Sequence, residues 1–115
     1  MATIEMFDSH VRSSGDLAGV FEHDGDTGYF YLYKTGGEAG HRILDYIRII
    51  SGNPDFGEED LSIRWDQGEQ KVGLFIRGEL WAVFDHQQRA RYGGDYKPGL
   101  RPLLPPQATS GLVAS

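Results

Sequence analysis

The turn at residues 24–28 is the first place where side chains could bind a ligand, because it reads Asp-Gly-Asp-Thr-Gly. An Asp-x-Asp-x-Gly opening is shared by several calcium loops, whose carboxylates supply hard oxygen ligands. No glutamate follows at the spacing where such a loop places its bidentate ligand. Asp and Gly are also the residues that a hairpin turn needs. We therefore predict a turn here and no metal site.

Histidines, serines and acidic residues, which often perform catalysis, are present, but their spacing matches no known catalytic motif. The four histidines show no metal-type spacing, and they are His10, His23, His41 and His86. The chain has no cysteine, and its serines lie outside any nucleophile-elbow context. Residues 58–60 are three consecutive acidic residues in a loop that also contains glycine and proline. Carboxylates in such a loop are usually solvated. We predict no catalytic residue and no cofactor.

A row of tyrosines is the strongest candidate for a binding surface. Tyr29, Tyr31 and Tyr33 alternate with Phe30 and Leu32, so one face of a strand would be aliphatic and aromatic and the other would carry three tyrosines. Trp81 lies out of phase with its apolar neighbours. We therefore predict that it lies on the same face of the sheet as the tyrosines. Such a face could anchor a partner, or a helix, the tail or a second layer could cover it.

The elements that must hold these residues are mainly strands. In residues 61–85 large apolar residues fall at every second position, as in Leu61, Ile63 and Trp65 or in Val72, Leu74 and Ile76. Turn residues 66–70 and 77–79 separate three such runs, which predicts three antiparallel strands.

A second strand-turn-strand unit precedes this stretch. Residues 17–23 and 29–34 predict a hairpin around the turn at 24–28. The isoleucine-rich segment 41–50 fits a helix or a buried strand by periodicity, and its place in a repeated unit favours the strand. The two units, 17–50 and 61–85, predict a mostly-β antiparallel meander of about six strands, either a curved sheet or a small open barrel.

The ends of the chain carry weaker signals. Residues 3–7 could form a short first strand, with a loop at 8–16, and residues 86–92 could form one or two helical turns. From residue 93 onward glycines and prolines prevent regular structure. We predict one β-rich domain over 1–92 and a tail over 93–115 that packs partly on the body, with residues 107–115 disordered.

Charge is distributed unevenly along the chain. The net charge is −6; residues 1–85 hold sixteen acidic and seven basic residues, whereas residues 86–115 hold four basic residues and one acidic residue. An acidic body repels phosphate backbones and attracts basic partners. We therefore predict no nucleic acid and a basic protein as the partner, although the charge could also serve only solubility.

Composition places the chain among ordinary globular domains, with 39% hydrophobic and 24% charged residues. No basic patch and apolar run follow Met1, and no apolar stretch approaches the roughly 18 residues of a membrane span. We expect no signal peptide, no membrane partner and a cytoplasmic location.

Several short segments resemble a known family. The segments Gly28-Tyr29-Phe30-Tyr31, Ile43-Leu44-Asp45 and Ala82-Val83-Phe84-Asp85, together with Trp65, are similar to a family of short bacterial domains of unknown function. Some members of that family resemble immunity proteins that neutralise a toxin. The resemblance covers roughly residues 17–85 and transfers no catalytic residue.

Our first hypothesis is a non-enzymatic acidic inhibitor or immunity-type protein that blocks a basic toxin or enzyme by surface complementarity. Acidic side chains would steer the encounter and exposed aromatic side chains would anchor it. The predicted partner-binding residues are Asp24, Asp26, Tyr29, Tyr31, Tyr33, Glu58, Glu59, Asp60, Asp66, Glu69 and Trp81.

Two other hypotheses belong to different functional classes. A small-molecule-binding barrel or hydrolase could have its pocket among Tyr31, Tyr33, Trp81 and His23, and a deep apolar pocket with convergent polar groups would favour it. A structural subunit could self-associate through an exposed edge strand.

Overall fold

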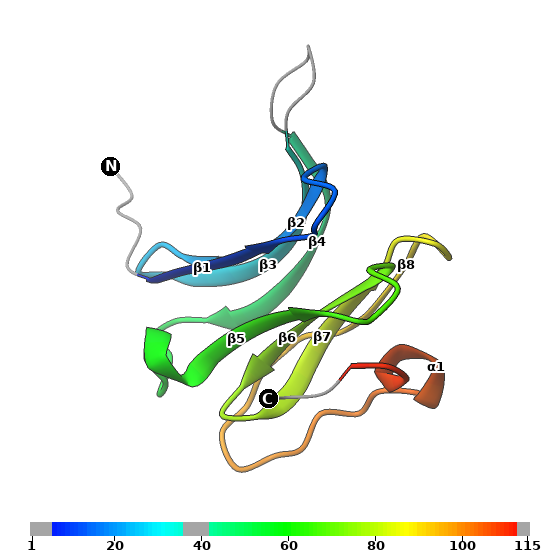
Figure 1. Cartoon of the computed structure of the whole chain (residues 1–115). Coiled ribbons are helices and arrows are strands. Elements are labelled where there is room, and N and C mark those ends of the chain that lie inside the picture. Colours follow the sequence, from blue (N-terminus) through cyan, green and yellow to red (C-terminus); the bar gives the residue numbers. More distant parts are fainter. Residues whose placement is uncertain (1–5, 36–41, 113–115) are drawn as a thin grey trace.

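The computed structural model describes residues 6–35 and 42–112 as two four-stranded antiparallel sheets that lie face to face (Figure 1). Sheet A has the order β1 (Met6–Val11), β2 (Leu17–His23), β3 (Thr27–Lys34) and β4 (Arg42–Ser51). Sheet B has the order β5 (Leu61–Trp65), β6 (Lys71–Ile76), β7 (Glu79–Asp85) and β8 (Ala90–Gly93). A 3₁₀ turn, η1 (Glu58–Asp60), precedes β5, and one short helix, α1 (Pro106–Thr109), follows β8.

The prediction of a mostly-β antiparallel fold is confirmed. The three strands expected between residues 61 and 85 are β5, β6 and β7, and residues 42–51 form a strand rather than a helix. The turn at 24–28 closes the β2–β3 hairpin, because the Asp24 carboxylate accepts hydrogen bonds from the backbone N–H groups of Asp26 and Thr27 at 2.9 and 2.8 Å. Here the Asp-x-Asp pattern provides a turn cap.

The strand count and the arrangement of the sheets were predicted incorrectly. The described residues form eight strands in two sheets, with no closed barrel, instead of a meander of six. The first strand continues to Val11, where we predicted a loop, and residues 90–93 form β8 where we predicted helical turns. Neither additional strand contains a fully buried residue, so neither shows the hydrophobic alternation that reveals a strand. Residues 3–5 of the predicted first strand lie outside the described residues.

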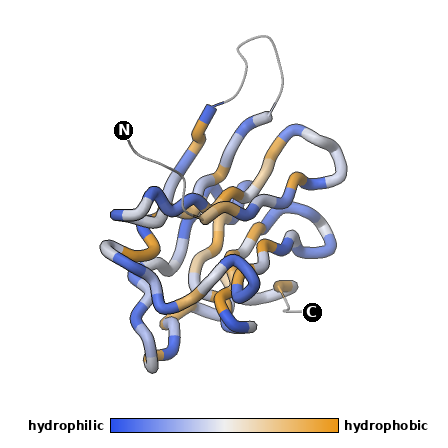
Figure 2. The backbone as a smooth tube through the Cα atoms, turned by 90° about the vertical axis from the view of Figure 1, so that its left-hand side faces the viewer, coloured by the Kyte–Doolittle hydropathy of each residue, from blue (hydrophilic) through white to orange (hydrophobic). Residues whose placement is uncertain are grey.

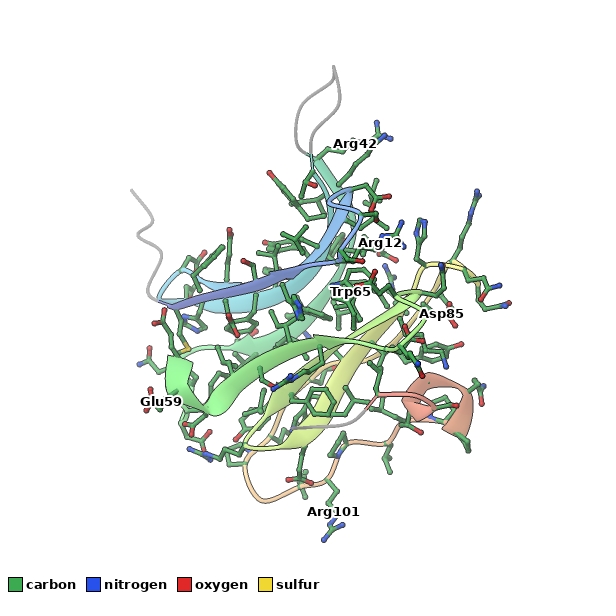
Figure 3. The ribbon with its side chains drawn as sticks, viewed as in Figure 1. Arg12, Arg42, Glu59, Trp65, Asp85 and Arg101 are labelled. Atoms are coloured by element: carbon green, nitrogen blue, oxygen red, sulfur yellow. The ribbon has the colours of Figure 1, made fainter. Side chains whose placement is uncertain are left out.

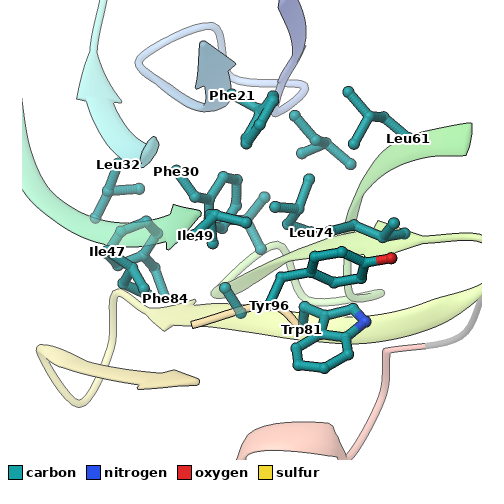
Figure 4. Packing of buried hydrophobic residues seen from close by; sticks show 14 of the residues in the cluster. Phe21, Phe30, Leu32, Ile47, Ile49, Leu61, Leu74, Trp81, Phe84 and Tyr96 are labelled. Carbon is teal, nitrogen blue, oxygen red and sulfur yellow. The ribbon is translucent and has the colours of Figure 1, made fainter. Parts of the chain in front are cut away.

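Apolar side chains from both sheets meet in one core. Phe30 of sheet A packs on Phe84 of sheet B with ring centroids 5.1 Å apart, and both side chains are buried (Figure 4). The hydrophobic stretches of the chain run through the middle of the molecule, whereas the turns are hydrophilic (Figure 2). The sheets approach closely at Gly19, where an added Cβ would lie 2.6 Å from Val72 Cγ2. A glycine is therefore required in the middle of β2.

Hydrogen bonds join the two sheets along both sides. On one side His10 Nδ1 lies 2.7 Å from the carbonyl oxygen of Ile63, and the Trp65 indole N–H donates to the carbonyl of His10 at 2.9 Å. On the other side the chain beyond β8 returns to β4, where Tyr96 N–H donates to the carbonyl of Ile49 at 2.7 Å. These bonds fix the stacking of the sheets.

The tail covers the outer face of sheet B. Ala108 and Leu112 are buried against Phe75 and Val83, and α1 lies below β7 in the view of Figure 1. We predicted disorder from residue 107 onward, whereas residues 107–112 pack against this sheet. Residues 113–115 lie outside the described residues.

Tyr96 anchors the beginning of this tail in the core. Its ring packs between Trp81, with centroids 4.8 Å apart, and Phe56, at 5.0 Å, and its hydroxyl donates to the Asp55 carboxylate at 2.7 Å. Burial, followed by the bond to Asp55, raises the pKa of Tyr96 to about 12. The Tyr96 hydroxyl and then Arg77 lower the pKa of Asp55.

This contact predicts a loss of stability at alkaline pH. The folded state raises the Tyr96 pKa above the ordinary 10.0, so the contribution is complete below pH 10 and is lost as pH rises toward about 12. We expect the free energy of unfolding, measured in urea between pH 8 and 12, to fall less steeply in Tyr96→Phe than in the wild type. Equal slopes in the two proteins would contradict this role for Tyr96.

Candidate functional site

The candidate site is the outer surface of sheet A, which we call the tyrosine face. Its residues come from all four strands of the sheet, and they are Phe7, Val20, Glu22, Tyr29, Tyr31, Tyr33, Ile43 and Tyr46. The strand register places Glu22 opposite Tyr29, with Phe7 opposite Glu22 on the other side. Tyr31 lies between Val20 and Tyr46 in the next row. Paired residues point to the same side of a sheet, so the period-2 pattern of β3 creates the face.

The aromatic rings contact one another across the strands. Tyr29 stacks on Tyr31 with centroids 5.9 Å apart, and the edge of Tyr46 meets Tyr29, also at 5.9 Å. The three predicted tyrosines are half-buried by these neighbours, whereas Tyr46 and Ile43 are 56% and 50% exposed. The rings are therefore held in fixed positions while still presenting apolar area to solvent.

No described helix or strand lies over the tyrosine face. Sheet B packs on the inner side of sheet A, and the tail with α1 packs on sheet B. In Figure 1 the side of β1–β4 that faces away from sheet B has no element above it. For residues 6–35 and 42–112, covering by the tail or by a second layer is therefore not observed. An uncovered face that carries several aromatic residues is typical of a binding surface.

A shallow pocket with an acidic group lies within this face. Its volume is about 200 Å³, and it is lined by Phe7, Val20, Glu22, Tyr31, Tyr33 and Ile43. Burial, followed by the negative charge of Glu22, raises the pKa of Tyr31. The Glu22 charge therefore acts on the hydroxyl of Tyr31.

Five of the predicted acidic residues lie at one end of the molecule. Asp24 and Asp26 belong to the β2–β3 turn, and residues 58–60 form η1, which contacts β1. Glu58 accepts a hydrogen bond from the backbone N–H of Phe7 at 2.9 Å, which brings η1 to the margin of the tyrosine face. Glu59 lies on η1 at this end (Figure 3). These charges flank the row of Phe7, Glu22 and Tyr29.

The other two predicted acidic residues lie in the turn between β5 and β6, away from this end. The Asp66 carboxylate accepts hydrogen bonds from the backbone N–H groups of Gln70 and Lys71 at 2.9 and 3.0 Å. Glu69 accepts a bond from Ser13 N–H at 3.0 Å, and Arg12 stacks over Trp65 at 5.7 Å beside it. Asp66 and Glu69 therefore bind parts of the fold to one another and do not join the tyrosine face.

Trp81 was assigned to the wrong surface. It is 4% exposed and lies in the core. Leu74 pairs with Ala82 whereas the next residue, Phe75, pairs with Leu80, so Trp81 is an extra residue in β7. Such a β-bulge shifts the side-chain alternation and turns the indole inward.

The pocket predicted among Tyr31, Tyr33, Trp81 and His23 is not formed. The two tyrosines lie on the outer side of sheet A, whereas Trp81 and His23 are buried between the sheets. His23 Nδ1 accepts a bond from Gly25 N–H at 3.0 Å, and its Nε2 lies 2.8 Å from the Gly52 carbonyl oxygen. Both ring nitrogens thus hold the turns at this end of the sandwich.

Sequence reasoning missed five contributors to the face, which are Phe7, Val20, Glu22, Ile43 and Tyr46. Glu22 follows Ala18 and Val20 at every second position of β2, so the period-2 pattern placed it on the outer side. Tyr46 could be assigned only after residues 42–51 were known to form a strand. Its position beside Tyr31 depends on a register that contains two irregularities.

The outer edges of sheet A are partly blocked. On β1, Phe7 N–H donates to Glu58 and Ser9 N–H donates to Asp8 at 2.9 Å each. On β4, the carbonyls of Arg48 and Ile49 accept hydrogen bonds from Asp95 and Tyr96. Bonded edge groups oppose pairing with another strand, so these contacts disfavour self-association by edge addition at these positions.

Comparison with known proteins identifies the family. Residues 2–102 match a family model described as "Uncharacterized protein conserved in bacteria (DUF2251)". The chain belongs to this family. This DUF2251 chain is also 28% identical over 101 residues to an uncharacterized protein of Haemophilus influenzae.

That alignment covers 85% of this DUF2251 chain and 62% of the relative's length. No solved structure matches the DUF2251 chain significantly. The resemblance to a bacterial family of unknown function is thus confirmed, whereas the resemblance to immunity proteins stays a prediction. In the described part of the DUF2251 chain, no helix has the length and apolar character to cross a membrane.

Proposed function

We propose that this domain is a non-enzymatic protein-binding module that holds a basic partner protein against the tyrosine face, in the manner of an inhibitor or immunity-type protein. The observation that carries the proposal is the row of Tyr29, Tyr31 and Tyr33, extended by Tyr46 on the neighbouring strand, over which no helix or strand of the described residues lies. Tyrosine offers a large contact area, a polar hydroxyl and few rotatable bonds, and it is enriched among residues that dominate binding energy.

The rigidity of the face supports this role. Each tyrosine stands on a strand whose other side is part of the core, as Phe30 and Leu32 show for β3. A surface that is ordered before binding loses less conformational entropy when a partner docks. Four strands whose outer side carries no other element of the described chain offer a broad docking area.

The charge distribution supports a basic partner. Glu22 lies within the tyrosine face, and the carboxylates of the β2–β3 turn and of η1 flank one end of it. Opposite charge on the partner would accelerate association and reject acidic competitors. Glu58 and Asp24 also bind backbone N–H groups, so their charges are held in place.

The proposal is tested by photo-crosslinking in cells that produce this protein. A photoreactive amino acid in place of Tyr46, which is 56% exposed on the face, is expected to capture one defined protein. The same amino acid in place of Leu103, which is 95% exposed on the tail, serves as the matched control. The combined substitution Tyr29→Ser, Tyr31→Ser and Tyr33→Ser should abolish capture of the same protein by affinity purification.

Loss of capture is informative only if the triple variant is folded. It must therefore unfold in a thermal transition like that of the wild type. A second variant, Leu100→Ser with Leu103→Ser, removes exposed apolar area from the tail and should leave capture unchanged. If the Tyr46 and Leu103 positions give the same crosslinks, or if the folded triple variant captures the partner as the wild type does, the tyrosine face is not the binding surface.

A further inference from the structure

We propose that the shallow pocket around Glu22 receives a single lysine or arginine side chain of the partner, and that this side chain is the central anchor of the complex. The inference rests on the proposed function, because it assigns a specific contact to the tyrosine face. It adds the chemistry of the group that is recognised and the residue that recognises it.

The size of the pocket fits one side chain. Its volume is about 200 Å³, whereas sites for small molecules usually enclose roughly 300–1,000 Å³. All four strands of sheet A contribute to its walls, with Phe7 from β1 and Ile43 from β4 at opposite sides. Every lining residue in the described part of the chain therefore stands on a strand of the sheet.

The lining combines the two groups that bind a cation with an aliphatic stem. Glu22 supplies a carboxylate, and the ring of Tyr31 supplies a π-face that attracts an ammonium or guanidinium group. Phe7, Val20 and Ile43 surround these groups with apolar surface, against which the methylene groups of lysine or arginine pack.

The charge of Glu22 is not neutralised within the described residues. No arginine, lysine or histidine of residues 6–35 and 42–112 forms an ion pair with it. Arg48, which lies opposite Tyr29 in the same row, is paired with Asp95 at 3.5 Å. A cation from outside is therefore the complementary group.

Other occupants fit the pocket less well. An apolar side chain would displace water from the Glu22 carboxylate without replacing its hydrogen bonds, which is unfavourable. An acidic side chain would meet a like charge. A neutral donor could also bond the carboxylate, but a cationic side chain does so with a stronger, charge-assisted hydrogen bond while its stem contacts the apolar rim.

The test uses defined peptides on the intact ¹⁵N-labelled protein, observed by NMR. The probe is acetyl-Gly-Gly-Arg-Gly-Gly-amide, and its matched control replaces arginine by citrulline, which has almost the same shape and no charge. We expect the arginine peptide to shift the amide signals of Glu22, Tyr31 and Tyr33 in a saturable manner. Citrulline should bind about tenfold more weakly, because a charge-assisted contact is lost.

Substitution of Glu22 provides the second measurement. Glu22→Gln keeps the side-chain shape. It should reduce the affinity for the arginine peptide to that for the citrulline peptide. Glu79→Gln, at the exposed start of β7 in sheet B, makes the same charge change outside the tyrosine face and should preserve the difference between the peptides. Equal binding of the two peptides by the wild type, shifts that map outside the pocket, or no shift at any concentration would each overturn the inference.

The failure of this inference can be distinguished from a failure of the proposed function. If Glu22→Gln captures the partner as the wild type does while the triple tyrosine variant does not, the face binds the partner without a cationic anchor. If neither variant changes capture, both the anchor and the face are excluded.

Discussion

Phe84→Ala is expected to lower the free energy of unfolding by about 3–5 kcal/mol, the range measured when large aromatic side chains are removed from protein cores. Phe84 is 1% exposed and packs on Phe30, which comes from the opposite sheet. Its removal would leave a cavity at the junction of sheets A and B, where neither sheet can move inward without disturbing the close contact at Gly19. Denaturant unfolding followed by tryptophan fluorescence measures the loss.

The matched control for this prediction is Phe7→Ala. Phe7 is the same residue type in the same fold, but it is 47% exposed on the tyrosine face, so its removal should cost less than about 1 kcal/mol. The double substitution of Phe30 and Phe84 should reveal a coupling of about 0.5–1.5 kcal/mol, as found for aromatic pairs. A cost for Phe84→Ala no greater than that of Phe7→Ala would mean that the two sheets are not joined through this contact.

Strands in which large apolar residues alternate could be predicted from the sequence. In β3 and β6 the large apolar residues recur at every second position, and the structure buries the residues of that set. The turns could be predicted equally well, because Asp24 and Asp66 accept hydrogen bonds from backbone N–H groups of the turns that they begin. These features depend only on neighbours along the chain, which a period or a turn pattern records.

The arrangement of the strands could not be predicted in the same way. Two hairpin units in series are compatible with one continued sheet or with two stacked sheets, because the local patterns are alike in both. The choice depends on residues 52–60, whose bonds include Arg77 Nη1 to the Asp55 carboxylate at 3.3 Å and His23 Nε2 to the Gly52 carbonyl at 2.8 Å. Contacts between residues so distant in sequence leave no periodic signal.

The candidate site could be predicted wherever side chains alternate regularly between the two faces of a strand. The tyrosines of β3 were placed correctly on one face, because the strand is regular at those positions. Trp81 was misplaced because a bulge in β7 reverses the alternation. Glu22 was overlooked because a single acidic residue in a strand gains meaning only when Phe7, Tyr31 and Tyr33 are known to surround it.

The acidic residues illustrate why composition alone does not define a binding surface. Asp66 and Glu69 accept backbone hydrogen bonds within the fold and away from the tyrosine face, so part of the acidic character of the body serves its turns. Glu22 has no such bond among the described residues. The charge available for a partner is therefore smaller, and more localised, than the net charge indicates.

Ala108→Glu is expected to detach the tail from sheet B and to lower the free energy of unfolding by about 2–4 kcal/mol. Ala108 is 0% exposed and lies in a cluster with Phe75, Val83 and Leu112. A carboxylate in that cluster would have no partner, so α1 would leave the sheet and the burial of Leu112 would be lost with it. Denaturant unfolding measures the cost, and limited proteolysis within residues 104–112 reports the detachment.

Gln107→Glu is the control, because it introduces the same side chain on the exposed side of α1, and it should be neutral within about 0.5 kcal/mol. The detached tail would expose Phe75 and Val83, so a dye that binds apolar surfaces should fluoresce more strongly with Ala108→Glu than with Gln107→Glu. The family match ends at residue 102, before α1, so this experiment also determines whether sheet B needs the segment beyond the match. Both variants could instead have the free energy of unfolding and the protease resistance of the wild type. That result would mean that the tail contributes no stability and that the outer face of sheet B is stable without a cover.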